Sequence, residues 1–368
     1  MNFLSLICFS KEPTDWFDQA LSEAQKGLGL THPNPAVGCV IVKDQKLIAA
    51  AHHVRAGEPH AEVNALYQAG PEARGATLYV TLEPCNHFGR TPPCTQAIIK
   101  AGIQKVIYGV SDPDPRVIGQ GAQVLGQAGI QVALVNHPDQ IAKAQALIRP
   151  FRKLAIQKQP YVLAKIACSL DGKIAFRPGQ QTQITGPESR QLVHRMREAC
   201  DAIVIGSETV LVDDPQLTAR FKERKALRQP IRIVLDGRLR THPKHKVYAA
   251  DGVQSYVIYG SGVEKSRIKA FEKAGVIGVA LEKSPLKLLQ YLGTLGLSCV
   301  LLEGGGQLLT SFLEQNLIDE LAWFTAPVIL GNQGVPAISN LSAMRYLSSC
   351  QMPEILSKDR LWLISSAC

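Results

Sequence analysis

The sequence lacks any long run of apolar residues, so we expect no membrane-spanning helix and no membrane partner. It also lacks a regular cysteine pattern. Its nine cysteines are odd in number and scattered, which does not suit a disulfide framework and favours a reducing compartment. The first ten residues contain no Lys or Arg and run into Lys11 and Pro13, which argues against a signal peptide. We therefore expect a cytoplasmic protein.

Clustered positive charge is also missing. Lys and Arg number 40 against 31 Asp and Glu, but the basic residues are dispersed, with no arginine-rich run and no aromatic-interleaved basic motif. A dispersed excess suits small anionic ligands better than nucleic acid. The pattern therefore predicts a phosphorylated small molecule as partner and no nucleic acid, and it leaves open whether the chain forms a homo-oligomer.

The length of 368 residues and the 46% of hydrophobic residues predict two domains with full cores. A helix-compatible pattern from Asp139 is expected to break at Pro150, and a basic run follows it. We therefore predict one domain over residues 1–150, a linker over 151–160 and a second domain over 161–368.

Residues 60 to 94 carry a pattern of metal ligands. His60, Cys85 and Cys94 supply one imidazole and two thiolates, which is a ligand set that catalytic zinc accepts while it keeps a fourth position for water. Glu62 would lie on a different helical face from His60, so it suits proton transfer better than ligation. Pro93 and the apolar pattern after it place Cys94 at a helix N-terminus, where the dipole favours a thiolate.

Zinc-dependent nucleobase deaminases carry His-x-Glu with a downstream Pro-Cys-x-x-Cys, and zinc there activates a water molecule while Glu moves protons. This chain matches except that eight residues separate Cys85 from Cys94. Two other interpretations stay open. In the first, Cys85 and Cys94 are buried free cysteines and His60 is a surface histidine. In the second, the zinc is structural and His87 is its fourth ligand.

Apolar patterns in the first half predict strands alternating with helices. A helix is expected over residues 17–28, and strands at 39–42, 47–51, 77–82, 106–110 and from 132. This order predicts an α/β sandwich with largely parallel later strands, whose ends meet helix starts at the catalytic groups. Prolines on both sides of Asn34 fix its loop, so its amide either contacts a base edge or forms a turn.

The second half repeats this alternation, with strands expected at residues 161–167, 202–205, 231–235, 257–259 and 299–302. Lys165 lies inside the first of these strands, so it either performs chemistry or sits in solvent on an edge strand. Arg190 and Arg197 share one face of the expected helix over 187–198, where they either bind phosphate or are solvated. The run Gly304–Gly306 between a strand and a helix either receives a nucleotide phosphate or forms a tight turn.

Four motifs in the first half resemble the RibD family of bifunctional riboflavin-biosynthesis deaminase/reductases. They read His-Ala-Glu, Glu-Pro-Cys-x-His-x-Gly-Arg-Thr-Pro-Pro-Cys, Pro-Asn-Pro-x-Val-Gly and Asp-Pro-x-Pro-x-Val-x-Gly-x-Gly. The resemblance implies a cytidine-deaminase-like α/β/α sandwich in which His60, Cys85 and Cys94 bind zinc and Glu62 moves protons. It also implies deamination of 2,5-diamino-6-(5-phosphoribosylamino)pyrimidin-4-one at its 2-amino group, and the base edge predicted to meet the Asn34 amide would then belong to this substrate. In the last of the four motifs, this chain has Gln120 where the family usually has a basic residue.

Three motifs in the second half resemble the same family's reductase domain, namely Lys-x-Ala-x-Ser-Leu-Asp-Gly, Asp-Asp-Pro-x-Leu-Thr-x-Arg and Glu-Gly-Gly. The resemblance implies a dihydrofolate-reductase-like α/β fold and NADPH-dependent reduction of the ribosyl group. We further expect Lys165 and Asp213 to be the polar pair near the reacting carbon. The implied NADPH contacts are Ala167, Gln183, Thr209, Asp213, Gly237, Gly305, Gly306, Gln307, Leu308, Leu309, Thr310 and Ser311. The implied substrate contacts are Gln181, Arg197, Leu217, Arg220 and Glu303.

This chain departs from the family at two reductase positions. Relatives commonly have Ser-x-Trp-Ile-Thr where this chain reads Gln181-Thr182-Gln183-Ile184-Thr185, and they usually have Ser where it has Gly237. The alternative function is a tRNA or nucleoside deaminase fused to an unrelated domain. That alternative predicts a two-residue cysteine gap and a concentrated basic surface, and the sequence has neither.

Overall fold

The computed structural model describes residues 3–8, 13, 15–88, 92–114, 117–343, 349–350 and 353–365. The chain divides into two compact units, Met1–Lys158 and Gln159–Cys368. Each unit has a hydrophobic core of its own. None of the helices among these residues is long and apolar enough to cross a bilayer.

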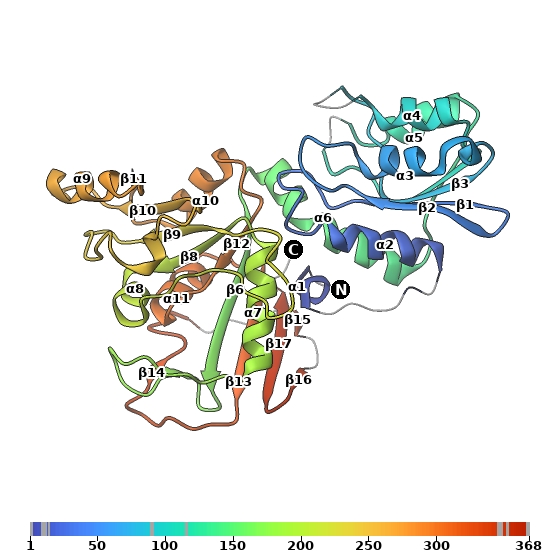
Figure 1. Ribbon diagram of the computed structural model, residues 1–368. Helices are drawn as coiled ribbons and strands as arrows, with labels where there is room; N and C mark the ends of the chain where they lie inside the picture. The colour runs from blue at the N-terminus through green and yellow to red at the C-terminus, as the bar shows by residue number, and fades with distance from the viewer. Residues whose placement is uncertain are drawn as a thin grey trace. The chain divides into compact units, whose positions relative to one another are not determined.

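The first unit is a five-stranded sheet in the order β2-β1-β3-β4-β5, with helices against it (Figure 1). Strand β1 pairs antiparallel with β2 and β3, whereas β3, β4 and β5 run parallel, as predicted for the later strands. The strands are β1 (Gly38–Lys43), β2 (Lys46–His52), β3 (Thr77–Leu82), β4 (Lys105–Val110) and β5 (Gln131–Leu134). The helices are α1 (Phe3–Cys8), α2 (Trp16–Lys26), α3 (Ala61–Ala69), η1 (Gly70–Ala73), α4 (Cys94–Ala101), α5 (Gln120–Gln127) and α6 (Pro138–Gln157).

Helix α2 shows how this unit is assembled from its sequence. The Asp15 carboxylate caps the helix by accepting from the Asp18 N–H at 2.8 Å, and the apolar face with Phe17 and Leu21 is buried. A Cβ at Gly38 would lie 2.0 Å from the Ala20 carbonyl oxygen. Glycine at this position therefore lets strand β1 approach the helix backbone closely.

The predicted break at Pro150 is wrong, because α6 continues from Pro138 to Gln157 with the proline inside it. Proline removes one backbone hydrogen bond from a helix interior, yet this proline is buried, as are Ala146, Leu147 and Ile148 of the same helix. Packing of the helix against α1, α2 and β4 outweighs that local loss. The predicted connector at 151–160 is accordingly helical over most of its length.

The second unit is built on a ten-stranded sheet in the order β11-β10-β9-β8-β12-β6-β13-β17-β15, with β16 paired to β17 (Figure 1). Strands from β11 to β13 run parallel, and β17 joins β13 antiparallel. The strands are β6 (Tyr161–Ser169), β7 (Lys173–Ala175), β8 (Ala202–Gly206), β9 (Ile231–Leu235), β10 (Ser255–Tyr259), β11 (Ile277–Ala280), β12 (Cys299–Leu302), β13 (Glu320–Ala326), β14 (Val335–Pro336), β15 (Ser349–Cys350), β16 (Glu354–Leu356) and β17 (Asp359–Ser365). The helices are α7 (Pro187–Ala199), α8 (Ser207–Asp213), η2 (Lys246–Tyr248), α9 (Lys265–Lys273), α10 (Pro285–Thr294) and α11 (Gly306–Glu314).

The parallel arrangement of the second sheet positions its candidate site. Strands β6, β8, β9 and β12 are parallel neighbours or next neighbours, so their carboxyl ends lie at one edge of the sheet. Ligands of open α/β sheets bind outside that edge. The segments after these strands hold most of the predicted reductase residues.

Candidate active sites

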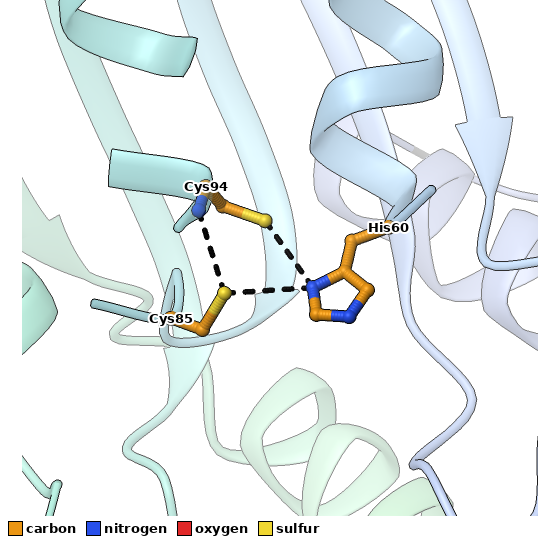
Figure 2. A group of neighbouring side chains, drawn as sticks. All are labelled: His60, Cys85 and Cys94. Carbon is orange, nitrogen blue, oxygen red and sulfur yellow. Dashed lines mark hydrogen bonds between the residues drawn. The ribbon is translucent and has the colours of Figure 1, made fainter. Parts of the chain in front are cut away.

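Three side chains of the first unit converge on one point, as Figure 2 shows. His60 is the N-cap residue of α3, Cys85 follows strand β3, and Cys94 is the first residue of α4. The His60 Nδ1 atom lies 3.5 Å from the Cys85 Sγ and 3.3 Å from the Cys94 Sγ. All three ligand atoms lie within 4.8 Å of one another. The fold therefore brings the three predicted ligands within reach of one ion.

The surroundings of the two thiols fit a zinc ion. Hydrogen bonds from the Cys94 thiol and from His60 lower the pKa of Cys85 to about 4, so this sulfur is a thiolate near neutral pH. The same contact with Cys85, together with burial, raises the pKa of Cys94. A bound cation would favour loss of the proton from the Cys94 thiol as well. One imidazole and two thiols with buried or half-buried side chains match the ligand chemistry of zinc.

Glu62 lies beside the cluster but outside it. Its side chain is only 3% exposed, and burial together with the negative charge of Cys85 raises its pKa to about 7. A carboxyl with a pKa in this range can both accept and return a proton near neutral pH. Within the described residues, the cluster comprises His60, Cys85 and Cys94 alone. This leaves a tetrahedral position free for water.

The structural-zinc interpretation needed His87 as a fourth ligand. Its side chain is exposed, and it does not belong to the cluster of ligand atoms. Both cysteines also lie too close to His60 for the interpretation of unrelated free thiols. Residues Gly89, Arg90 and Thr91 of the cysteine motif, and Pro115 and Arg116 of the aspartate–proline motif, lie outside the described residues.

Sequence reasoning missed His53, which connects Asn34 to the metal cluster. Its Nε2 atom lies 3.2 Å from the Asn34 amide nitrogen, and its Nδ1 atom lies 3.1 Å from the Pro59 carbonyl oxygen. Its ring meets the His60 ring edge-on at 5.2 Å between centroids. Burial lowers the pKa of His53, which favours a neutral ring. The available signal was a histidine pair, His52 and His53, at the end of a predicted strand.

Glu83 orders the loop that follows β4. Its buried carboxylate accepts hydrogen bonds from the backbone N–H groups of Asp112 at 3.2 Å, Gly119 at 3.0 Å and Ala122 at 3.2 Å. Two of these donors lie at the start of α5, where the helix dipole favours a negative charge. The aspartate–proline motif is therefore held against the strand that leads to Cys85.

Lys165 lies in the interior of the second sheet, because β6 is flanked by β12 and β13. The edge-strand interpretation of this lysine is therefore wrong. Its Nζ atom lies 6.0 Å from the centroid of the Phe324 ring, and burial lowers its pKa against the opposing charge of Glu303. A partly desolvated lysine beside a carboxylate suits binding of an anion or proton transfer.

Arg197 and Glu303 form a two-point ion pair between α7 and the end of β12. The Arg197 Nε and Nη2 atoms donate to the two carboxylate oxygens at 2.7 and 2.9 Å. The side chains are 14% and 9% exposed, so the pair is largely removed from water. Arg190 instead donates to the Thr185 carbonyl oxygen at 2.7 Å. The two arginines of α7 thus have separate partners.

The segment after α8 contains Leu217 and Arg220. Leu217 is 3% exposed and has a φ of +53°, a left-handed backbone that leucine rarely adopts. The exposed Arg220 side chain donates to the Gln216 side-chain oxygen at 2.9 Å. The Thr218 carbonyl oxygen accepts from Arg197 at 3.1 Å, which joins this segment to the ion pair.

The strand–glycine–helix arrangement predicted for residues 299–314 is present. Gly305 is the N-cap residue of α11, and a Cβ at Gly306 would lie 2.5 Å from the Pro336 carbonyl oxygen. Close packing therefore requires glycine at position 306. The helix begins at the carboxyl edge of the sheet, where its N–H groups are suited to a phosphate.

Hydroxyl groups of α11 are already engaged within the unit. Thr310 Oγ1 donates to the Gly306 carbonyl oxygen at 2.7 Å and accepts from the Ser339 N–H at 2.9 Å. Ser311 donates to the Leu308 carbonyl oxygen at 2.8 Å. Of the other predicted cofactor positions here, Gln307 is exposed and Leu309 is buried.

The remaining predicted reductase residues have varied surroundings. Ala167, Thr209 and Asp213 are half-buried, and burial alone raises the pKa of Asp213. Gly237 follows β9 with nothing within 4 Å of an added Cβ, so the serine of relatives would fit there. Gln181 and Gln183 are exposed, and within the described residues no hydrogen bond joins them to another predicted site residue.

Two family models match this chain, one in each unit. The cytidine and deoxycytidylate deaminase zinc-binding region matches residues 10–110. The RibD C-terminal domain matches residues 160–354. The second match overturns the alternative of a deaminase fused to an unrelated domain.

Curated and solved proteins are similar over both units. Riboflavin biosynthesis protein RibD of Aquifex aeolicus is 42% identical over 312 residues, which are 85% of this chain and 86% of the relative. The Escherichia coli protein of the same name is 41% identical over 85% of this chain and 87% of its own length. Acinetobacter baumannii RibD, form 1, superposes with a TM-score of 0.86 at 37% identity, covering 99% of this chain and 100% of that one. The diaminohydroxyphosphoribosylaminopyrimidine deaminase/5-amino-6-(5-phosphoribosylamino)uracil reductase of Thermotoga maritima has a TM-score of 0.84 at 33% identity, covering 96% and 98%.

Proposed function

Because the chain belongs to the RibD family, we propose that its two units catalyse consecutive reactions on one phosphorylated pyrimidine. The protein is a bifunctional deaminase and reductase of riboflavin biosynthesis, hence both a hydrolase and an oxidoreductase, and it uses zinc and NADPH. The proposed first substrate is 2,5-diamino-6-(5-phosphoribosylamino)pyrimidin-4-one. The second is 5-amino-6-(5-phosphoribosylamino)uracil, and the final product is 5-amino-6-(5-phosphoribitylamino)uracil.

The deaminase is assigned to the first unit, and the cluster of His60, Cys85 and Cys94 carries that assignment. Zinc held by these three residues would supply an activated water molecule for attack on the amino-bearing carbon. Glu62 would take the two protons of that water in turn and pass one to the ring nitrogen beside the carbon and one to the departing amine, so that ammonia leaves and a carbonyl oxygen remains. Its burial and its pKa of about 7 support this role.

Asn34 is proposed to present its amide to the pyrimidine edge. Support for this role comes from His53, which contacts Asn34 on one side and the His60 ring on the other. A side chain held in this way loses little conformational entropy when it binds a ligand. The turn-forming interpretation is compatible with the same geometry, because the Asn34 backbone N–H also donates to the Thr31 carbonyl oxygen at 2.9 Å.

The reductase is assigned to the second unit, where NADPH supplies the hydride to C1′ of the opened ribosyl group. Lys165 and Asp213 are proposed to lie near that carbon, and the desolvated surroundings of both support the proposal. Proposed substrate contacts are Gln181, Arg197, Leu217, Arg220 and Glu303. Proposed cofactor contacts are Ala167, Gln183, Thr209, Asp213, Gly237 and residues 305–311.

We further propose a deaminase domain over residues 1–150 and a reductase domain over 161–368. The boundary between the two compact units lies between Lys158 and Gln159, inside the region proposed as a linker. We propose a cytoplasmic location with neither nucleic acid nor membrane as partner. The dispersed basic residues support a small anionic substrate.

The test uses the purified full chain with the diaminopyrimidine phosphate, with and without NADPH. Without NADPH, we expect release of ammonia and accumulation of the aminouracil phosphate. After NADPH is added, we expect its oxidation and formation of the ribityl product. Oxidation of NADPH before any ammonia is released would contradict the proposed order, and the absence of ammonia release would contradict the deaminase assignment.

A further inference from the structure

The turn formed by residues 217–220 is held by side chains rather than by a strand partner. The Thr218 carbonyl oxygen accepts from Arg197 Nη1 at 3.1 Å. The Gln229 side-chain amide bonds both sides of Ala219, accepting from its N–H at 2.8 Å and donating to its carbonyl oxygen at 2.8 Å. Leu217, at the start of the turn, has a left-handed backbone conformation that leucine disfavours. The contacts to Thr218 and Ala219 therefore have to maintain the shape of the turn.

His194 also contacts this turn. It lies on α7, three residues before Arg197, so both side chains face the same side of the helix. Its Nδ1 atom is 3.1 Å from the Thr218 carbonyl oxygen and 3.3 Å from the Arg220 backbone nitrogen. One tautomer donates to the carbonyl and the other accepts from the N–H, so either form of the ring is bonded to the turn.

The His194 ring is itself fixed in place. It is half-buried, and the Phe221 ring packs against it edge-on at 6.4 Å between centroids. The guanidinium of Arg224 covers Phe221 at 3.9 Å from its centroid. In either tautomer the restrained ring is therefore bonded to one of two successive peptide groups of the turn, and this contact adds to the one from Arg197.

We propose that His194 is a positioning residue of the reductase, which fixes the 217–220 turn so that Leu217 and Arg220 face the pyrimidine substrate. This inference rests on the proposed function, which assigns those two residues to substrate binding. Helix α7 then contributes two residues to the site. Arg197 pairs with Glu303, and His194 holds the neighbouring turn in position.

The first test compares the steady-state kinetics of the full-length wild type and His194→Leu. Loss of the bond to the turn is expected to raise the KM for the aminouracil phosphate about tenfold. We expect the KM for NADPH and the deaminase activity of the other unit to be unchanged. Gln191→Leu, on an exposed part of the same helix, is the matched control and should behave as wild type. An unchanged KM for the pyrimidine, or an equal rise for NADPH, would overturn the proposal.

Two conservative variants separate positioning from folding. An asparagine amide can reach the position of Nδ1, so His194→Asn should keep the pyrimidine KM close to the wild-type value, whereas His194→Gln should behave like the leucine variant. Equal behaviour of the two variants contradicts the proposal even if His194→Leu does not fold.

Hydrogen–deuterium exchange of the ligand-free protein gives a readout that does not depend on the substrate. His194→Leu, or His194→Gln in its place, should raise exchange in the peptide over residues 213–221 and leave α11 unchanged. Unaltered exchange in that peptide overturns the inference. A wild type that shows the ordered turn but does not reduce the pyrimidine would instead contradict the proposed function.

Discussion

Two buried glutamates of the first unit, Glu83 and Glu62, have different surroundings and different roles. Glu83 accepts from three backbone N–H groups and thereby orders a loop. Glu62 has desolvated surroundings beside Cys85, and its pKa rises to about 7. The same side chain therefore provides a structural anchor at one position and a proton carrier at the other.

Glu62→Gln should remove the proton carrier while it preserves side-chain volume. We expect the deaminase kcat to fall by about two to four orders of magnitude, because general acid–base catalysis typically contributes that much. Zinc content, measured by atomic absorption, should stay at the wild-type level, since Glu62 lies outside the ligand cluster. The exposed Glu72→Gln is the control. Deaminase activity that survives in Glu62→Gln would leave the cluster with a structural role.

At the scale of single residues, the sequence predicts side chains that lie close together in short motifs. His60 and Glu62 are two residues apart, and both lie at the start of a predicted helix. His53 and His194 were missed because their roles come from partners distant in the chain, such as Asn34 and the Thr218 carbonyl. The sequence shows which hydrogen bonds a histidine is able to form, but only the three-dimensional structure shows its actual partners.

Among the elements, buried strands were predicted best. The bounds of β3, β9 and β12 agree with the prediction, because each is a short, mostly apolar segment that ends at an acidic residue. The prediction ended helix α6 too early because it relied on the low helix propensity of proline at position 150. In the folded protein, packing of the helix outweighs that propensity. Short strands such as β14 have no apolar pattern of their own and depend on pairing partners.

The first turn of α5 depends on a close approach that leaves no room for a side chain. A Cβ at Gly121 would lie 1.9 Å from the carbonyl oxygen of Pro84, the residue that precedes Cys85 in the motif. We expect Gly121→Ala to reduce the free energy of unfolding of the first unit by about 1–3 kcal/mol and to lower deaminase activity. Urea unfolding and steady-state kinetics measure both effects.

Gly126 in the same helix is the matched control, since nothing lies within 4 Å of its added Cβ. Gly126→Ala should stabilise the unit by about 0.5–1 kcal/mol, because alanine has the higher helix propensity. If the two variants change stability equally, the close approach of α5 to Pro84 does not matter.

At the scale of the whole molecule, each unit has its own core and its own set of candidate catalytic residues. Removal of zinc by a chelator under reducing conditions should therefore abolish deamination and leave reduction of the aminouracil phosphate intact. Added zinc should restore the first activity. Parallel loss of both activities would show that the second unit depends on the metal.

The stems of the loop between the two cysteines are tied together independently of the metal. The Thr95 hydroxyl donates to the Asn86 side-chain oxygen at 2.8 Å, and the Thr95 N–H donates to the Cys85 carbonyl oxygen at 3.3 Å. The residues next to the two cysteines are thereby held together, so the fold alone keeps the two sulfurs close enough to share an ion.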